Sequence, residues 1–255
     1  MKVYEFQAKN ILKKYGVCVP RGNAVSQSLD APKIFQEIGS RRCGVKAQIL
    51  AGGRGKGGGI QFATTSAEAQ ASTAGMLGTY LVTHQTNQKG IEIKYVLIEE
   101  AVSIKKELYL AITIDRSLQT PILIASAEGG VEIEEVAKKS PDSIIKEPID
   151  IFFGFHPFQI RRIASKLDIS GISSTRINNL ITNLFSAFVN NDCSLLEINP
   201  LVVTMGDELC ALDAKMDIDD NALYRHQEFE QISQYQDVSP VEALAKKYKL
   251  SYISL

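Results

Sequence analysis

The chain has 255 residues, and 45% of them are hydrophobic, which is enough to bury the core of one large domain or two small ones. Its 28 Lys and Arg nearly balance its 29 Asp and Glu, and this balance argues against a general nucleic-acid binder. No apolar run approaches the roughly 18 residues needed to cross a bilayer, and the first residues lack the apolar core of a secretory signal. Four scattered cysteines without CxxC spacing favour a reducing compartment. We therefore expect a soluble, cytoplasmic protein with neither nucleic acid nor a membrane as partner.

The predicted elements begin with two helices. Apolar residues share one face over 5–15, and Gly16 then ends that helix. A second helix starts at Ser28 or Asp30 and ends at Gly39. Thr65 and Glu68 form a capping box at the start of a later helix that runs to about residue 77. The remaining elements expected in chain order are strands at 45–50, 60–64, 93–99, 107–115 and 121–126, two helices within 158–190, a hairpin over 194–215, and a helix starting near Pro240.

Hairpins mixed with helices favour an α+β or α/β arrangement over a regularly alternating parallel sheet. The expected seam between two halves lies near 100–104, where two strand patterns meet. The last residues, 250–255, have the pattern of a strand that has just begun, so we expect a fragment boundary there.

A glycine-dense loop follows the strand predicted at 45–50. Between Ala51 and Gly59 it contains six glycines in 52–59 together with Arg54 and Lys56. Glycine lets successive N–H groups converge on an anion, and the two cations add charge that suits phosphate oxygens. The loop therefore predicts a phosphate-binding flap, with a merely flexible surface hairpin as the alternative.

Two named phosphate motifs can be tested against this loop. The Walker A motif fails, because Lys56 is followed by Gly57 and Leu50 stands where its first glycine is required. The dinucleotide pattern GxGxxG is met by Gly53, Gly55 and Gly58, but a strand pattern follows where that motif needs a helix. A strand, a glycine loop and a second strand favour a flap over the phosphates of a nucleotide.

An acidic hairpin over 194–215 predicts a metal site. If Gly206 is the centre of its turn, Asn199 faces Asp213 and Glu197 faces Lys215. Period-2 alternation places these four on one face of the hairpin. Carboxylate and amide oxygens suit Mg²⁺, whereas the alternative is a solvated polar face with one ion pair.

Three further charged residues are candidates for the same site. Lys46 lies in a predicted strand just before the glycine loop and is expected to reach a phosphate, or otherwise to be an edge lysine. Glu99 and Glu107 flank the predicted seam, where a nucleotide would lie between two lobes.

Several of these segments together resemble one family, the β subunits of ADP-forming succinyl-CoA synthetases (succinate–CoA ligases). The resemblance covers nearly the whole chain, and the order of the pieces makes it specific. The matching pieces are Tyr4-Glu-Phe-Gln-Ala-Lys9, Val45-Lys-Ala-Gln48, Ala51-Gly-Gly-Arg-Gly-Lys56, Lys106-Glu-Leu-Tyr-Leu110, Glu128-Gly-Gly-Val-Glu-Ile-Glu134, Glu197-Ile-Asn-Pro-Leu201 and Asn221-Ala-Leu223.

The resemblance implies an α+β, ATP-grasp fold, in which two α/β lobes with antiparallel sheets hold a nucleotide between them. The N-terminal lobe is then expected over 20–102, and the C-terminal lobe over 1–19 and 103–240. Residues 241–255 would begin a linker or further domain. The family's C-terminal CoA-ligase-type domain would be absent, so the chain alone is expected to be catalytically incomplete.

The resemblance also implies roles for particular residues. It places the nucleotide, ATP or ADP, on Lys46, Gly53, Arg54, Gly55, Glu99, Val102 and Glu107. It places Mg²⁺ on Asn199 and Asp213, in agreement with the hairpin. Glu197 resembles the catalytic acidic residue that meets a phosphohistidine of the partner subunit. Val102 departs from the family, which often has a hydroxyl residue there, and we expect little effect because contacts to adenine at that point are largely main-chain.

The reaction that the resemblance implies is succinate + CoA + ATP ⇌ succinyl-CoA + ADP + phosphate, a step of the tricarboxylic acid cycle. The partner would be an α subunit that carries the phosphohistidine, with CoA and succinate bound mainly outside this chain. A ligase for another dicarboxylate, such as malate or citrate, stays open, as does a non-catalytic nucleotide-sensing subunit. The residues do not decide between adenine and guanine.

Overall fold

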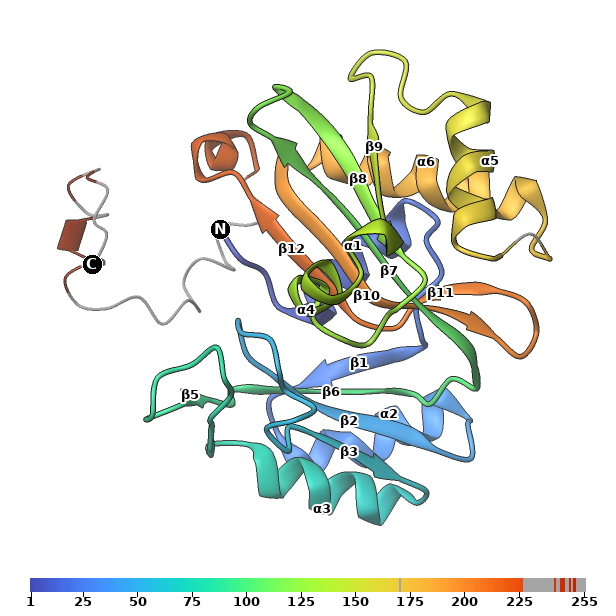
Figure 1. Ribbon diagram of the computed structural model, residues 1–255. Helices are drawn as coiled ribbons and strands as arrows, with labels where there is room; N and C mark the ends of the chain where they lie inside the picture. The colour runs from blue at the N-terminus through green and yellow to red at the C-terminus, as the bar shows by residue number, and fades with distance from the viewer. Residues whose placement is uncertain (170, 227–240, 242–243, 246–247, 249, 251–255) are drawn as a thin grey trace.

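The structure is a computed structural model that describes residues 1–169, 171–226, 241, 244–245, 248 and 250. The helix expected near Pro240 and the strand expected over 250–255 fall largely outside the described residues. Two antiparallel sheets, one above the other in Figure 1, dominate the described part. None of the described helices combines the length and the apolar character that a bilayer crossing requires.

The smaller sheet has four strands in the order β1-β6-β2-β3, and every pairing in it is antiparallel. Helices α2 and α3 pack on each other and on this sheet, and they bury Ala31, Ile38, Ala69 and Met76. The helix that begins after Thr65 is confirmed, because the Thr65 hydroxyl accepts a hydrogen bond from the Glu68 N–H. The elements of this half are β1 (Gly22–Val25), η1 (Ser28–Asp30), α2 (Ala31–Ile38), β2 (Cys43–Gln48), β3 (Ile60–Ala63), α3 (Ser66–Met76), β4 (Tyr80–Leu81), β5 (Ile91–Glu92) and β6 (Tyr95–Glu100).

The larger sheet follows the order β11-β10-β7-β8-β9, with β12 paired to β10. Helices α5 and α6 lie over it, and α6 buries an i, i+3, i+4 stripe that includes Ile177, Leu180, Ile181 and Leu184. Its elements are β7 (Ile104–Asp115), β8 (Thr120–Ser126), α4 (Ile133–Lys139), η2 (Pro141–Ser143), β9 (Ile144–Pro148), α5 (Pro157–Lys166), α6 (Ser174–Asn190), β10 (Cys193–Thr204), β11 (Leu209–Ala211), β12 (Ala214–Ile218) and η3 (Asp220–Arg225).

The first helix of the chain, α1 (Glu5–Lys14), packs with the larger sheet although it precedes the smaller one. Its residues Ala8, Ile11 and Leu12 belong to the same core cluster as α6 and β10. It ends as expected at Gly16, whose φ of 76° is a left-handed conformation that glycine adopts without steric cost. In Figure 1, α1 lies behind the strands of the larger sheet, and it packs against β12 and α6.

The connection between the sheets is short. Residues 101–103 join the end of β6 to the start of β7, where the seam was expected. The division into lobes at 20–102 and at 1–19 plus 103–240 stays a prediction.

Candidate functional site

The glycine loop joins β2 to β3, as the alternation on either side of it predicts. It folds back on itself, because the N–H of Gly57 donates to Gly53 O at 3.0 Å and the N–H of Gly59 donates to Arg54 O at 2.8 Å. The tip is different. Over residues 53–56, no backbone N–H has an acceptor among the described residues. Consecutive N–H groups without an acceptor form a concave site for an anion.

Two residues outside the loop hold it in place. The side-chain oxygen of Gln85 accepts a hydrogen bond from the Gly52 N–H at 2.8 Å. The ring of His84 lies against Gly53, where a β-carbon would come within 2.5 Å of it. The same ring reaches the other half of the molecule, since its Nε2 lies 2.7 Å from Glu132 Oε1. This support could not be predicted from the sequence, because neither Gln85 nor His84 belongs to a motif.

The acidic hairpin forms as predicted from Gly206. Glu197 pairs with Lys215 between β10 and β12, and the N–H of Asn199 donates to Asp213 O at 3.2 Å. The opposite face is apolar, with Leu196 and Ile198 both buried. The predicted metal ligands are therefore cross-strand neighbours.

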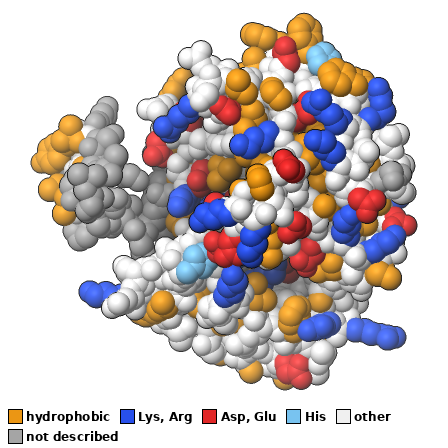
Figure 2. Space-filling model, viewed as in Figure 1, with side chains coloured by type: hydrophobic (Ala, Val, Ile, Leu, Met, Phe, Trp, Pro, Cys, Tyr) orange, Lys and Arg blue, Asp and Glu red, His pale blue; other side chains and the backbone are white. Residues whose placement is uncertain are grey.

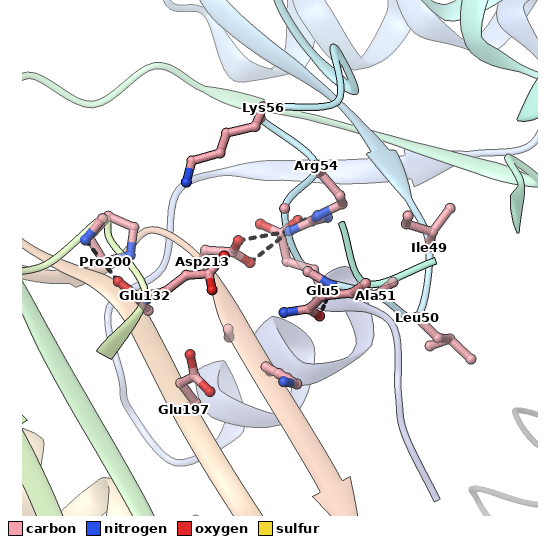
Figure 3. Close-up of a pocket in the computed structure, with 18 of the residues that line it drawn as sticks. Glu5, Ile49, Leu50, Ala51, Arg54, Lys56, Glu132, Glu197, Pro200 and Asp213 are labelled. Carbon is pink, nitrogen blue, oxygen red and sulfur yellow. Dashed lines mark hydrogen bonds and ion pairs between the residues drawn. The ribbon is translucent and has the colours of Figure 1, made fainter. Parts of the chain in front are cut away.

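A cavity of about 350 Å³ lies between the glycine loop and this hairpin. Figure 3 shows Arg54 from the loop meeting Asp213 from the hairpin, with Glu197 on the opposite side of Asp213. Acidic and basic side chains gather along the middle of the face seen in Figure 2. Among the predicted site residues, six line the cavity: Gly53, Arg54, Gly55, Glu197, Asn199 and Asp213.

The other predicted residues lie around this cavity. Lys46 and Glu99 are buried beside it, and the ammonium of Lys46 lies 2.5 Å from Glu99 Oε1. Val102 is half-buried in the connection at 101–103, and Glu107 is exposed on β7. Neither Val102 nor Glu107 lines the cavity. The structure therefore places eight of the ten predicted residues in or beside the cavity, and these two at the margin of the cavity.

Both predicted metal ligands have protein partners in this conformation. The Nη2 of Arg54 donates to both oxygens of Asp213 at 2.8 Å. The amide oxygen of Asn199 accepts from the Gly130 N–H at 2.8 Å, and its nitrogen donates to Val131 O at 2.9 Å. The segment after β8 therefore lies on Asn199, and the acidic stretch that begins at Glu128 is part of the site.

Burial and neighbouring charges shift two groups of the site. Burial raises the pKa of Glu197, Lys215 lowers it, and the negative charges of Glu134 and Asp213 raise it further, with a net upward shift. Burial alone would lower the pKa of Lys46, but the carboxylates around it outweigh that effect and raise this pKa above its ordinary value.

Sequence reasoning missed two residues of the site, Glu5 and Lys9. Both lie on α1 and are buried, with exposed fractions of 4% each. Glu5 contacts the predicted phosphate ligands Lys46 and Arg54 directly. Both lie in the first piece that resembles the family, but their spacing of four positions on a helix also describes many solvated pairs, so it did not single them out.

Comparison with known proteins gives the chain a family context. The profile of the ATP-grasp domain matches residues 2–203. The chain is 49% identical over its whole length to the protein named succinate–CoA ligase [ADP-forming] subunit beta from Anaeromyxobacter dehalogenans (strain 2CP-C), and 47% identical to the protein of that name from Geobacter sulfurreducens. The resemblance inferred from the motifs is thereby confirmed. The match includes every residue of this chain and covers 66% of the length of the Anaeromyxobacter protein.

Solved structures with the same fold are more distant in sequence. ATP citrate lyase from Methanothrix soehngenii aligns with a TM-score of 0.67 at 22% identity, over 96% of this chain and 59% of the other. The dinucleotide-forming acetyl-coenzyme A synthetase 1 of Ca. Korarchaeum cryptofilum aligns with a TM-score of 0.64 at 15% identity, over 85% and 92% respectively. At these identities the likeness concerns the fold, and with the antiparallel sheets it confirms the predicted α+β class.

Proposed function

Because the chain belongs to the ATP-grasp family, we propose that it is the nucleotide-binding part of the β subunit of an ADP-forming succinate–CoA ligase. The relatives that match it over its whole length carry that name. The observation that carries the proposal is the tip of the glycine loop. Its N–H groups over 53–56 have no acceptor among the described residues, and these residues line a cavity together with Asn199 and Asp213.

The cations and N–H groups are proposed to bind the phosphates. Gly53, Arg54 and Gly55 lie at the tip of the loop, and Lys46 lies in the strand that leads to it. A planar guanidinium suits two phosphate oxygens at once, and backbone N–H groups supply directed donors. Glu99, Val102 and Glu107 are proposed to contact the rest of the nucleotide.

Asn199 and Asp213 are proposed to hold Mg²⁺. Their oxygens fit this ion, which takes one or two carboxylates and completes its shell with water and phosphate oxygens. Their cross-strand placement on β10 and before β12 brings the two side chains to one wall of the cavity. When bound, Mg²⁺ would neutralise charge on the phosphates.

The reaction proposed for the complete enzyme is succinate + CoA + ATP ⇌ succinyl-CoA + ADP + phosphate, through a phosphohistidine on an α subunit. Glu197 is proposed to meet that histidine. Partial burial raises the pKa of Glu197, and a half-buried carboxylate attracts an imidazolium. CoA and succinate would bind mainly outside this chain, and the cytoplasmic location stays a prediction.

Calorimetric titration of the chain with Mg-ADP, Mg-GDP and NADH tests the nucleotide site. We expect saturable binding of Mg-ADP, loss of that binding in Lys46→Ala, and no binding of NADH. Lys33→Ala is the matched control, because Lys33 is an exposed lysine on α2. If the wild-type chain bound no nucleotide, or if Lys33→Ala lost binding equally, the proposal would be wrong.

The phosphoryl step is tested with a partner. We expect the β subunit, supplied with Mg-ATP and an α subunit of a succinate–CoA ligase, to phosphorylate that subunit on histidine. A histidine phosphate is recognised by its loss in acid and its persistence in alkali. Glu197→Gln should slow this transfer while Mg-ADP still binds, and an unchanged transfer rate would remove Glu197 from the proposed role.

A further inference from the structure

The carboxylate of Glu5 gathers donors from several segments. Its Oε1 accepts from Lys9 Nζ at 2.7 Å and from Lys46 Nζ at 3.1 Å. Its Oε2 accepts from Arg54 Nη1 at 2.6 Å and from Gln48 Nε2 at 3.1 Å. Both proposed phosphate-binding cations, Lys46 and Arg54, are therefore attached to one carboxylate.

Lys9 completes the arrangement from one helical turn further along α1. Its Nζ donates to Glu5 Oε1 at 2.7 Å, to Glu99 Oε2 at 2.6 Å and to Leu212 O at 2.7 Å. The Nζ of Lys46 contacts the same three residues, including Leu212 O at 3.0 Å. The two ammonium groups thus share their acceptors, and Lys9 fixes the positions of the acceptors that Lys46 uses.

Charge balance explains why a buried cluster of this size is tolerated. The cations Lys9, Lys46 and Arg54 face the carboxylates of Glu5, Glu99 and Asp213, so three formal charges of each sign cancel. Burial would raise the pKa of Glu5, but the three cations outweigh that effect and hold this pKa well below its ordinary value. Removing one member would leave a buried charge without its partner, which is costly.

The cluster also joins the two halves of the molecule. Glu5 and Lys9 belong to α1, which packs with the larger sheet, whereas Lys46 and Arg54 belong to the smaller sheet and its glycine loop. Without Glu5, Arg54 would keep its ion pair with Asp213, and Lys46 would keep its ion pair with Glu99. Both cations would then be drawn away from their present positions at the cavity.

From this geometry we infer that Glu5 and Lys9 are positioning residues, which hold Lys46 and Arg54 where the phosphates of the nucleotide bind. The inference rests on the proposed function, because it assigns the two residues a role in that same site. They act through the cations, so their effect should extend to ligands with phosphates and not to the nucleoside.

Glu5→Gln and Lys9→Met in the 255-residue chain test this inference. Each variant is titrated with Mg-ADP and with adenosine. We expect Glu5→Gln to raise the Kd for Mg-ADP by about tenfold to a hundredfold, the range of a lost hydrogen bond to a charged group. Lys9→Met should raise this Kd less, because Lys46 retains its own acceptors. The affinity for adenosine should stay unchanged in both.

The chain offers a matched control on another helix. Lys33 and Glu37 form an acid–base pair with the same four-residue spacing on α2, but their side chains are 78% and 51% exposed. Glu37→Gln and Lys33→Met should leave both Kd values unchanged. A further comparison uses Arg54→Met as background, in which Glu5→Gln should have a smaller effect on Mg-ADP because one of the two cations it holds is gone.

The outcomes separate this inference from the proposed function. If wild type failed to bind Mg-ADP, the proposed function would fail. Suppose that wild type binds Mg-ADP. The positioning role would then be wrong if Glu5→Gln left the Kd for Mg-ADP unchanged, as Glu37→Gln should, or if it raised the Kd for adenosine as much as the Kd for Mg-ADP. Should Glu5→Gln not fold by circular dichroism, Glu5→Asp carries the test, since it retains the charge but is one methylene too short. A folded Glu5→Asp with unchanged Mg-ADP affinity would equally overturn the inference.

Discussion

One nitrogen of Arg54, Nη2, donates to both carboxylate oxygens of Asp213 at 2.8 Å, so a proposed phosphate ligand and a proposed metal ligand neutralise each other. Arg54 is buried, whereas the side chain of Asp213 is 34% exposed and open to the cavity. A phosphate that binds Arg54 would break its ion pair with Asp213, so that Asp213 could bind a cation. A cation that binds Asp213 would likewise free Arg54 to bind a phosphate. Metal and nucleotide should therefore favour each other's binding.

Asp213→Asn tests this relationship, because we expect it to strengthen ADP binding without Mg²⁺ and to remove the effect of Mg²⁺. In the absence of Mg²⁺ we expect the variant to bind ADP about tenfold more tightly than wild type, because Arg54 no longer has to leave a carboxylate. A charge-assisted hydrogen bond is worth about 1.5–3 kcal/mol, and the partial exposure of Asp213 reduces that value. Mg²⁺ should no longer strengthen the binding of ADP in this variant, as we expect it to do in wild type. Titrations of ADP with EDTA and with Mg²⁺ measure both effects.

Asp217→Asn is the control for this pair, because Asp217 lines the same cavity and has no ion pair with Arg54. Its loss removes a negative charge from the cavity wall without freeing the guanidinium. If Asp213→Asn and Asp217→Asn changed metal-free ADP binding to the same extent, general electrostatics would explain the result. A lower affinity of Asp213→Asn for ADP under both conditions would contradict the coupling.

The support of the glycine loop gives a second prediction. Gly53 has a φ of 78°, and an added β-carbon would come within 2.5 Å of the His84 ring, which lies 2.7 Å from Glu132. Gly53→Ala should therefore strain the backbone and also displace His84, and it should weaken Mg-ADP binding. Gly58→Ala is the matched control, since its φ is 80° with nothing within 4 Å of the added carbon. Equal losses of affinity in the two variants would show that only the backbone conformation matters.

Much of this site could be predicted from local sequence patterns. The centre of the turn at Gly206 was sufficient to pair Glu197 with Lys215 and to place Asn199 beside Asp213, because the register of a hairpin follows from its turn. The ends of α1 and α2 followed from Gly16 and from Gly39, which adopts φ 64°. In each case the information lies within a few residues of the feature.

Other features depend on contacts between distant segments. The partners of Glu5 lie as much as 49 residues away and those of Lys9 as much as 203, so no local pattern predicts these contacts. Helix α4 was missed because Val136 is the one buried residue in it, which leaves no apolar stripe. Strand β1 was missed because it has four residues with Val25 alone buried, too few to establish a period.

Glu197 gives a prediction for the pH dependence of stability. Its pKa is raised in the folded protein, so the folded state binds this proton more tightly than the unfolded state, and the associated stability is lost as the pH rises through the folded pKa. Glu197→Gln removes the charge and should raise the Tm at about pH 8, with the gain vanishing below about pH 4, where the carboxyl of wild type is protonated in both states. Melting curves across this range test it, with Glu135→Gln, an exposed carboxylate on α4, as control. A gain that did not depend on pH would point to packing rather than charge.

Cys18 gives the last prediction, for chemical reactivity. A hydrogen bond with the Cys210 thiol lowers the pKa of Cys18 to about 7, against an opposing effect of burial and of the nearby acids Glu208 and Glu100. Cys18 is also exposed, while the other three cysteines are buried. Since the thiolate is the nucleophile, iodoacetamide should alkylate Cys18 first, at a rate whose midpoint lies near pH 7.

Cys210→Ala removes the hydrogen bond and should move that midpoint upward, whereas Cys193→Ala, a buried cysteine elsewhere, should leave it in place. Peptide mass spectrometry after timed alkylation would measure each site, and labelling of Cys18 that was insensitive to Cys210→Ala would show that exposure alone sets its reactivity.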